Sequence, residues 1–144
     1  MHKEIFKEYF EVRDNEIDIQ GIVNNSNYMI YLAHARHKYA HKFGINFSEY
    51  AKNNQNFVVI SCTLNFKQPL KPDDKFYVTC KVVPTDSAIR FAFEQEIRFE
   101  ENNKLVLKAE FIATCVNGNA KSMSEKLYVP EGIKQLYENA VEGI

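Results

Sequence analysis

A change in the spacing of apolar residues, from one long helical stretch to a series of strands, most constrains the fold. Between Asn27 and Phe43, apolar side chains recur at steps of three and four residues, as on one face of a helix. From Val58 onward they alternate with other residues, as in strands that bury one face. One long helix beside such strands has a single efficient packing, in which the sheet curls around the helix. The sequence therefore predicts an α+β fold.

The expected elements follow one another as strand, helix, four meandering antiparallel strands and a C-terminal helix. The first strand is expected from Ile5 to Val12. The four meandering strands are expected from Val58 to Phe66, from Phe76 to Pro84, from Ile89 to Phe99 and from Leu105 to Cys115. Gly44 is expected to end the long helix in a left-handed conformation. A last helix is expected to begin at Pro130 or Glu131, because proline is favoured in a first helical turn. The residues expected to face the core are Phe6, Phe10, Tyr28, Tyr31, Leu32, Ala35, Tyr39, Phe43, Val58, Ile60, Cys62, Leu64, Phe66, Phe76, Val78, Cys80, Val82, Ile89, Phe91, Phe93, Ile97, Phe99, Leu105, Leu107, Ala109, Phe111, Ala113, Cys115, Ile133, Leu136, Tyr137 and Ala140.

Length and charge limit the class of protein. The 144 residues fit one domain, expected over residues 1–144 without a linker. The formal net charge is −1, with acids and bases spread along the chain, so nucleic acid is not expected as a partner. No apolar window approaches the length of a membrane span, and the charged N-terminus does not resemble a signal peptide. We therefore expect a cytoplasmic protein with no membrane partner.

The cysteines and helix histidines do not predict a metal site. Cys62, Cys80 and Cys115 are odd in number and widely spaced, which favours buried free thiols over disulfides or a zinc site. The three histidines of the long helix lie opposite its apolar stripe, so we interpret them as part of a polar face; they are His34, His37 and His41.

Asp18 is the candidate for chemistry, because it is the only acidic residue in residues 17–48. Helix starts usually attract acids, since first-turn N–H groups and the macrodipole favour negative charge. The predicted first turn, residues 27–30, has none, which leaves its positive end free for a carbonyl oxygen or an anion. A purely structural interpretation stays open. Aspartate often bonds its own backbone beside a glycine turn, and Asn25 or Ser26 could be only an N-cap.

A set of residues around Asp18 stands at a specific spacing. Its positions are Asp18, Gly21, Val23, Asn24, Asn25, Tyr28, Tyr31, Ala35 and Arg36. This pattern resembles that of the hotdog-fold acyl-CoA thioesterases, the group that contains 4-hydroxybenzoyl-CoA thioesterase. The sequence departs from it at Ile22, where many relatives carry His, and at Ala33, where many carry an acid, and both departures leave the acyl group open. The resemblance extends in weaker form from about residue 5 to about residue 116.

This resemblance implies a hotdog fold, an antiparallel sheet of about five strands wrapped around one long central helix. It implies a homodimer, which could double to a homotetramer. It also implies hydrolysis of an acyl-CoA to a carboxylic acid and CoA, with no cofactor other than the CoA of the substrate. Asp18 would attack the carbonyl carbon or act as general base for water, two roles that the sequence leaves open. Asn25 would donate its backbone N–H to the oxyanion at the helix N-terminus.

The same resemblance implies a set of substrate-binding residues. Gly21 would permit close approach, Asn24 and Ser26 could orient water or the carboxylate, and Tyr28 and Tyr31 would line the wall near the acyl group. Two cations that flank strands, Lys67 and Arg90, are expected near the CoA phosphates.

Other functions remain open at this point. The thioester could be carried by an acyl carrier protein instead of CoA. The chain could also be a non-catalytic acyl-thioester-binding protein, which the departures at Ile22 and Ala33 would favour. Hotdog dehydratases and hydratases pair a histidine with the acid, and no histidine stands near Asp18 in the turn.

Overall fold

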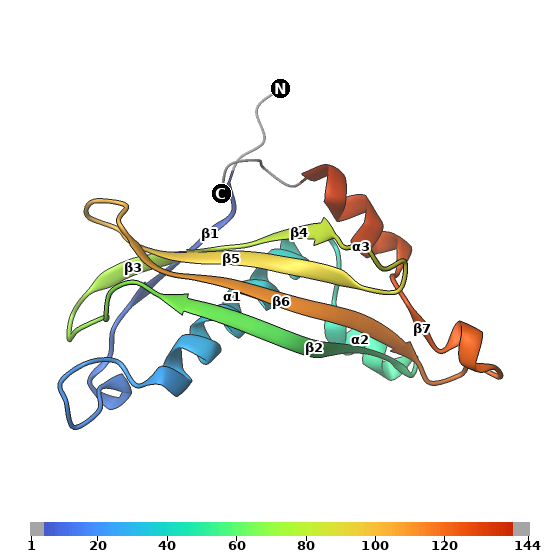
Figure 1. Ribbon diagram of the computed structural model, residues 1–144, viewed down its shortest axis with the longest axis horizontal. Coiled ribbons are helices and arrows are strands. Elements are labelled where there is room, and N and C mark those ends of the chain that lie inside the picture. Colours follow the sequence, from blue (N-terminus) through green and yellow to red (C-terminus); the bar gives the residue numbers. More distant parts are fainter. Residues whose placement is uncertain (1–4, 140–144) are drawn as a thin grey trace.

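The computed structural model describes residues 5–139, which form one antiparallel sheet curled around a long helix (Figure 1). This architecture confirms the predicted α+β arrangement. In chain order the elements are β1 (Lys7–Glu11), η1 (Asp14–Glu16), α1 (Asn25–Lys42), α2 (Phe47–Lys52), β2 (Gln55–Phe66), β3 (Lys75–Thr79), β4 (Lys81–Pro84), β5 (Phe91–Phe99), β6 (Leu105–Asn117), η2 (Met123–Glu125), β7 (Leu127–Tyr128), α3 (Glu131–Leu136) and η3 (Tyr137–Asn139).

Five strands form the main path of the sheet, in the order β1-β3-β5-β6-β2. The other two extend it, since β4 pairs with β5 and β7 pairs with β6. The predicted single strand from Phe76 to Pro84 is wrong in one respect, because it divides at Cys80 into β3 and β4. The short strand β7 was not predicted. Within the described chain, β2 has a single neighbour, β6, so its other side is a free edge.

Helix α1 confirms the predicted apolar stripe. Tyr28, Tyr31, Leu32, Ala35 and Tyr39 are all buried, and they pack in one core with the strands. The helix begins at residue 25, two residues earlier than expected, and ends at residue 42. The residue at position 44 has φ +84°, the left-handed conformation expected of a glycine after a helix. The predicted burial of residue 43 is wrong, because this residue is the C-cap that follows the last turn of α1 and it is 37% exposed.

Strand β2 departs most from the predicted pattern. Its pairing with β6 shifts register between Val59 and Ser61, so one residue is added there as a bulge. Phe57 and Leu64 therefore both pack against the core, because they lie seven positions apart in the sequence while their partners on β6, Cys115 and Ala109, lie six apart. The predicted burial of the even-numbered residues of β2 is wrong for all of them except Leu64, which is partly buried. Val58, Ile60, Cys62 and Phe66 are exposed.

The remaining differences are local. Cys80 and Cys115 are buried free thiols, as predicted. Ile89 is exposed because it lies in the turn before β5, outside the strand in which it was expected. The last helix begins after Pro130 and buries Ile133, as predicted, together with Leu136. The predicted contribution of Ala140 lies outside the described residues.

Candidate active site

Asp18 lies in a tight turn that leads into α1. The backbone N–H of Asp18 donates to Ile22 O at 2.8 Å, and the N–H of Gly21 donates to Asp18 O at 3.0 Å. Gly21 has φ +80°, a conformation that glycine adopts without strain. One carboxylate oxygen of Asp18 accepts the N–H of Gln20 at 2.8 Å, as the structural interpretation expected. Its second oxygen has no partner within residues 5–139, so the turn holds the carboxylate and leaves one oxygen available.

The N-terminus of α1 is capped, which corrects the expectation of a fully free helix end. Asn24 is the N-cap, and its side-chain oxygen accepts both the backbone N–H and the hydroxyl of Ser26 at 2.9 Å. The N–H of Asn27 donates to Asn24 O at 2.9 Å. The N–H of Asn25 is different, since no acceptor for it occurs among the residues that the structure describes. The cap thus leaves the amide predicted to bind the oxyanion as an available donor of the first turn.

A cavity of about 240 Å³ lies beside Asn25. Asn25 and Tyr28 line it from α1, and Phe66 and Lys67 line it from the end of β2. The rings of Tyr28 and Phe66 meet edge to face, with centroids 5.3 Å apart. Three of the predicted site residues therefore lie around one cavity, and the rest of its wall is mostly apolar.

Asp18 does not line this cavity, but its charge reaches it. The Tyr28 hydroxyl accepts the buried N–H of Leu70 at 2.9 Å. Burial raises the pKa of Tyr28, the hydrogen bond from Leu70 lowers it, and the negative charges of Asp74 and Asp18 raise it further. Asp18 is thus close enough to act electrostatically on a residue in the cavity wall.

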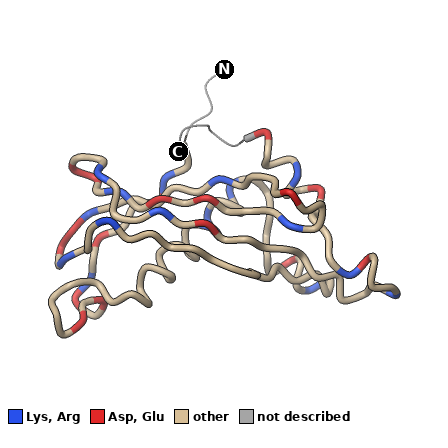
Figure 2. Tube along the Cα trace, viewed as in Figure 1, with Lys and Arg blue, Asp and Glu red and all other residues tan. Residues whose placement is uncertain are grey.

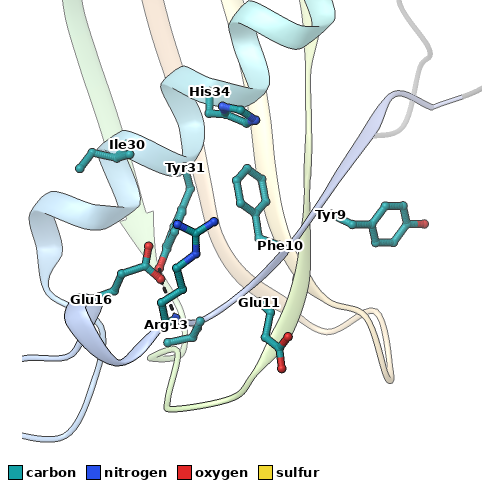
Figure 3. A pocket seen from close by; sticks show the side chains of 9 residues that line it. Tyr9, Phe10, Glu11, Arg13, Glu16, Ile30, Tyr31 and His34 are labelled. Carbon is teal, nitrogen blue, oxygen red and sulfur yellow. Dashed lines mark hydrogen bonds between the residues drawn. The ribbon is translucent and has the colours of Figure 1, made fainter.

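Tyr31 points to a different place from Tyr28. Its hydroxyl donates to a carboxylate oxygen of Glu16 at 2.7 Å, and its ring packs on Phe10 (Figure 3). The ring also packs on Phe76. Burial and this hydrogen bond raise the pKa of Tyr31. Tyr31 lines a separate cavity of about 510 Å³ between β1 and α1, into which Arg13 also projects. Within one subunit, Tyr31 is therefore not brought into the cavity beside Asn25.

The two predicted cations lie at opposite ends of the sheet. Lys67 follows β2 and borders the cavity beside Asn25. Arg90 is exposed and precedes Phe91. Phe91 of β5 and Val59 of β2 both pair with Ala113 of β6, so Arg90 lies level with the first half of β2, whereas Lys67 follows its last residue. The sheet thus separates Arg90 from the helix N-terminus within one subunit.

Glu16, to which the sequence assigned no role, supports the site. Its side chain holds Tyr31, and its backbone oxygen accepts the N–H of Asn24 at 3.0 Å and the Asn27 side chain at 3.1 Å. Arg36, a position of the family resemblance to which no role was assigned, does not line the cavity beside Asn25; it is partly buried and donates to Gln95 at 3.1 Å. The sequence contained a signal for this pair, because Gln95 is the only polar residue among the alternating residues of β5 that are otherwise apolar.

The histidines of α1 are exposed, as the interpretation of a polar face predicted, although Nε2 of His34 lies 4.0 Å from Glu8. Across residues 5–139, no three His, Cys, Asp or Glu side chains are grouped in a way that could hold a metal ion. None of the described helices has both the length and the apolar character needed to cross a membrane.

Comparison with known proteins places these features in a family context. A family profile described as the thioesterase-like superfamily matches residues 12–136. The acyl-acyl carrier protein thioesterase ATL3 of Arabidopsis thaliana, a chloroplastic protein, is 32% identical over 127 residues. The match covers 88% of this chain but 64% of that protein, so the chain spans less than two thirds of the relative's length.

Solved structures share the fold at low sequence identity. A 1,4-dihydroxy-2-naphthoyl-CoA thioesterase from Synechocystis has a TM-score of 0.80 and 17% identity, over 93% of this chain and 96% of that one. A Staphylococcus aureus protein solved in complex with CoA has a TM-score of 0.81 and 17% identity, over 96% and 87%. These likenesses confirm the predicted hotdog fold.

Proposed function

The chain belongs to the thioesterase-like superfamily, and on that basis we propose that it hydrolyses an acyl thioester at the start of α1. Water would add to the carbonyl carbon, the carbon–sulfur bond would break, and a carboxylic acid and a thiol would be released. Thiolates are good leaving groups, so the reaction does not require a general acid for the sulfur. Hydrolysis of a thioester then requires only one carboxylate and one hydrogen-bond donor to the oxyanion.

One observation carries the proposal: the N–H of Asn25 has no acceptor within the described chain, and Asn25 lines a cavity together with Tyr28, whose pKa the negative charge of Asp18 helps to raise. A backbone donor at a helix N-terminus stabilises the negative charge that develops on a thioester oxygen. Removal of one such donor in a hydrolase typically costs about 10²–10³ in turnover. Asp18 would supply the second function, as nucleophile or as general base for water.

Hydrolysis of a panel of acyl-CoA esters, followed through the free thiol, tests the proposal. We expect Asp18→Ala and Asp18→Asn to lose activity by orders of magnitude on the best substrate. Asp86→Ala is the matched control, because Asp86 is an exposed aspartate in the turn between β4 and β5. Equal rates for wild type and Asp18→Ala would refute the assignment. Tight binding of acyl-CoA without turnover would instead support the non-catalytic alternative.

The carrier of the acyl group is CoA or an acyl carrier protein. The Arabidopsis relative is named as an acyl-acyl carrier protein thioesterase, and the Staphylococcus structure was solved with CoA. We propose CoA, with Lys67 at the cavity as a contact for its phosphates. The ratio of kcat/KM for one acyl group on the two carriers, measured for wild type and Lys67→Met, decides between them. If CoA is the carrier and Lys67 contacts its phosphates, Lys67→Met lowers kcat/KM for the CoA ester.

We also propose that the active protein is a homodimer joined along the free edge of β2. This strand has twelve residues and no charged side chain, as the uninterrupted neutral trace in Figure 2 shows. Val58, Val59 and Ile60 are each more than 40% exposed along it. A long apolar edge strand is a template for pairing with another strand. A tetramer and a cytoplasmic location stay predictions, which sedimentation and cell fractionation would test.

A further inference from the structure

Arg36 is a partly buried cation that lacks a charged partner. No carboxylate of the described residues lies within ion-pair distance of it. Burial lowers the pKa of the guanidinium, and the groups that raise it are the thiols of Cys80 and Cys62. A guanidinium stays charged in proteins, so its charge is present at neutral pH. Burying a charge is costly unless it is paired, and this one is paired with no anion.

Neutral contacts fix the position of the guanidinium. Its carbon Cζ lies 4.0 Å from the centre of the Phe111 ring, and one terminal nitrogen donates to the side-chain oxygen of Gln95 at 3.1 Å. Gln95 is fully buried and is itself held by donation to Leu32 O at 3.0 Å. Only one of the five N–H donors of Arg36 is used in these contacts. The side chain is therefore held in place with most of its hydrogen-bonding capacity unused.

Arg36 also lines a cavity of about 270 Å³ between α1, α2 and β2. Most of the wall is apolar and comes from Phe47, Phe57, Val59 and Phe93. The lining contains no acidic residue. Its volume is just below the range for drug-sized ligand pockets, which is about 300–1,000 Å³, so it suits a small ligand. Arg36 follows Asn25 by eleven residues on α1, so the two cavities are separated by about 16 Å along the helix.

We propose that this cavity binds a small apolar carboxylic acid as its carboxylate, with the anion against Arg36 and the hydrocarbon against the surrounding aromatic rings. A carboxylate matches the planar fork of a guanidinium and accepts charged hydrogen bonds from it. The apolar wall accounts for the remainder of the ligand. This inference goes beyond thioester hydrolysis and does not depend on it, although a carboxylic acid is also the class of product that hydrolysis would release.

Titration of the whole protein with benzoate and with benzamide, followed by calorimetry and by backbone amide NMR shifts, tests the proposal. The two probes have the same ring and nearly the same size, and they differ in charge. Since a hydrogen bond to a charged group is stronger than one to a neutral group, we expect benzoate to bind at least about tenfold more tightly. The largest shifts should fall on residues 56–59, which border the cavity.

Variants separate Arg36 from the proposed catalytic site. Arg36→Met should remove the preference for benzoate, and Arg36→Lys should reduce it because the planar fork is lost. Lys67→Met, which removes the cation of the other cavity, and Asp18→Ala should both keep it. Equal affinity for benzoate and benzamide in the wild type would overturn the proposal, whatever the fold of the variants. Shifts centred on Asn25 and Lys67, with binding lost in Lys67→Met, would also overturn it.

Discussion

Replacing Tyr28 with phenylalanine removes one hydroxyl and leaves one buried donor without an acceptor. That donor is the N–H of Leu70, which is fully buried and bonds Tyr28 at 2.9 Å. An unpaired buried donor costs about 1–3 kcal/mol of the free energy of unfolding. For a domain of this size, each kcal/mol lowers the Tm by roughly 2–8 °C. We therefore expect Tyr28→Phe to be a folded but measurably less stable variant.

Tyr77→Phe is the matched control, since it also removes one tyrosine hydroxyl. The partner of Tyr77 is the side-chain oxygen of Asn103, at 2.8 Å, and Asn103 is exposed and can bond water instead. Its loss should cost about 0.5–1.5 kcal/mol at most. Urea unfolding at constant m-value measures both variants. Equal stability losses would refute the argument. A Tyr28→Phe protein as stable as wild type but inactive would show that the hydroxyl acts on substrate.

Three further predictions concern the edge, the cap and pH. Val59→Lys places a charge on the β2 edge and should convert the dimer to a monomer, seen by light scattering during gel filtration. Asn24→Ala should cost about 1 kcal/mol through loss of the N-cap, whereas Asn24→Asp should keep the stability measured by urea unfolding. Partial loss of solvent around His37 lowers its pKa from the usual 6.5, and the electrostatic effects of Arg36 and His34 lower it further. The unfolded chain then takes up the proton first, so stability should fall as pH drops below about 6.5, and His37→Gln should weaken that fall in unfolding curves.

The periodicity of the sequence was sufficient to predict the main elements, because burial of one face repeats over many residues. The long helix and its five buried stripe residues are examples. Local detail was harder to predict. Asn24, Asn25 and Ser26 are all good N-caps, so composition could not identify which of them starts the helix. The bulge between Val59 and Ser61 depends on pairing with β6 and leaves no distinct pattern in β2 itself.

From the sequence, candidate site residues could be grouped only where they are close together along the chain. Asp18, Asn25 and Tyr28 lie within eleven consecutive residues that form a turn followed by a helix start, and Asn25 and Tyr28 line one cavity. Tyr31 is on the same stripe as Tyr28, but it faces Glu16 and β1, a contact that depends on how the helix sits in the sheet. The burial and the partner of Arg36 could not be predicted without knowing which strand residue packs against it. Gln95, a polar residue in an apolar run, was the only indication of a buried polar partner.

The proposed dimer would connect the two cavities that one subunit keeps apart. Two identical strands paired across a two-fold axis run antiparallel, so an axis near the middle of β2 would set the Phe66 end of one copy beside the Gln55 end of the other. Phe66 borders the cavity next to Asn25, and Asn56, the neighbour of Gln55, borders the cavity next to Arg36. The two cavities would then meet across the interface. It follows that Val59→Lys should lower hydrolysis as well as dissociate the dimer, although Asp18 is unchanged. A monomeric variant with full activity would show that each subunit holds a complete site.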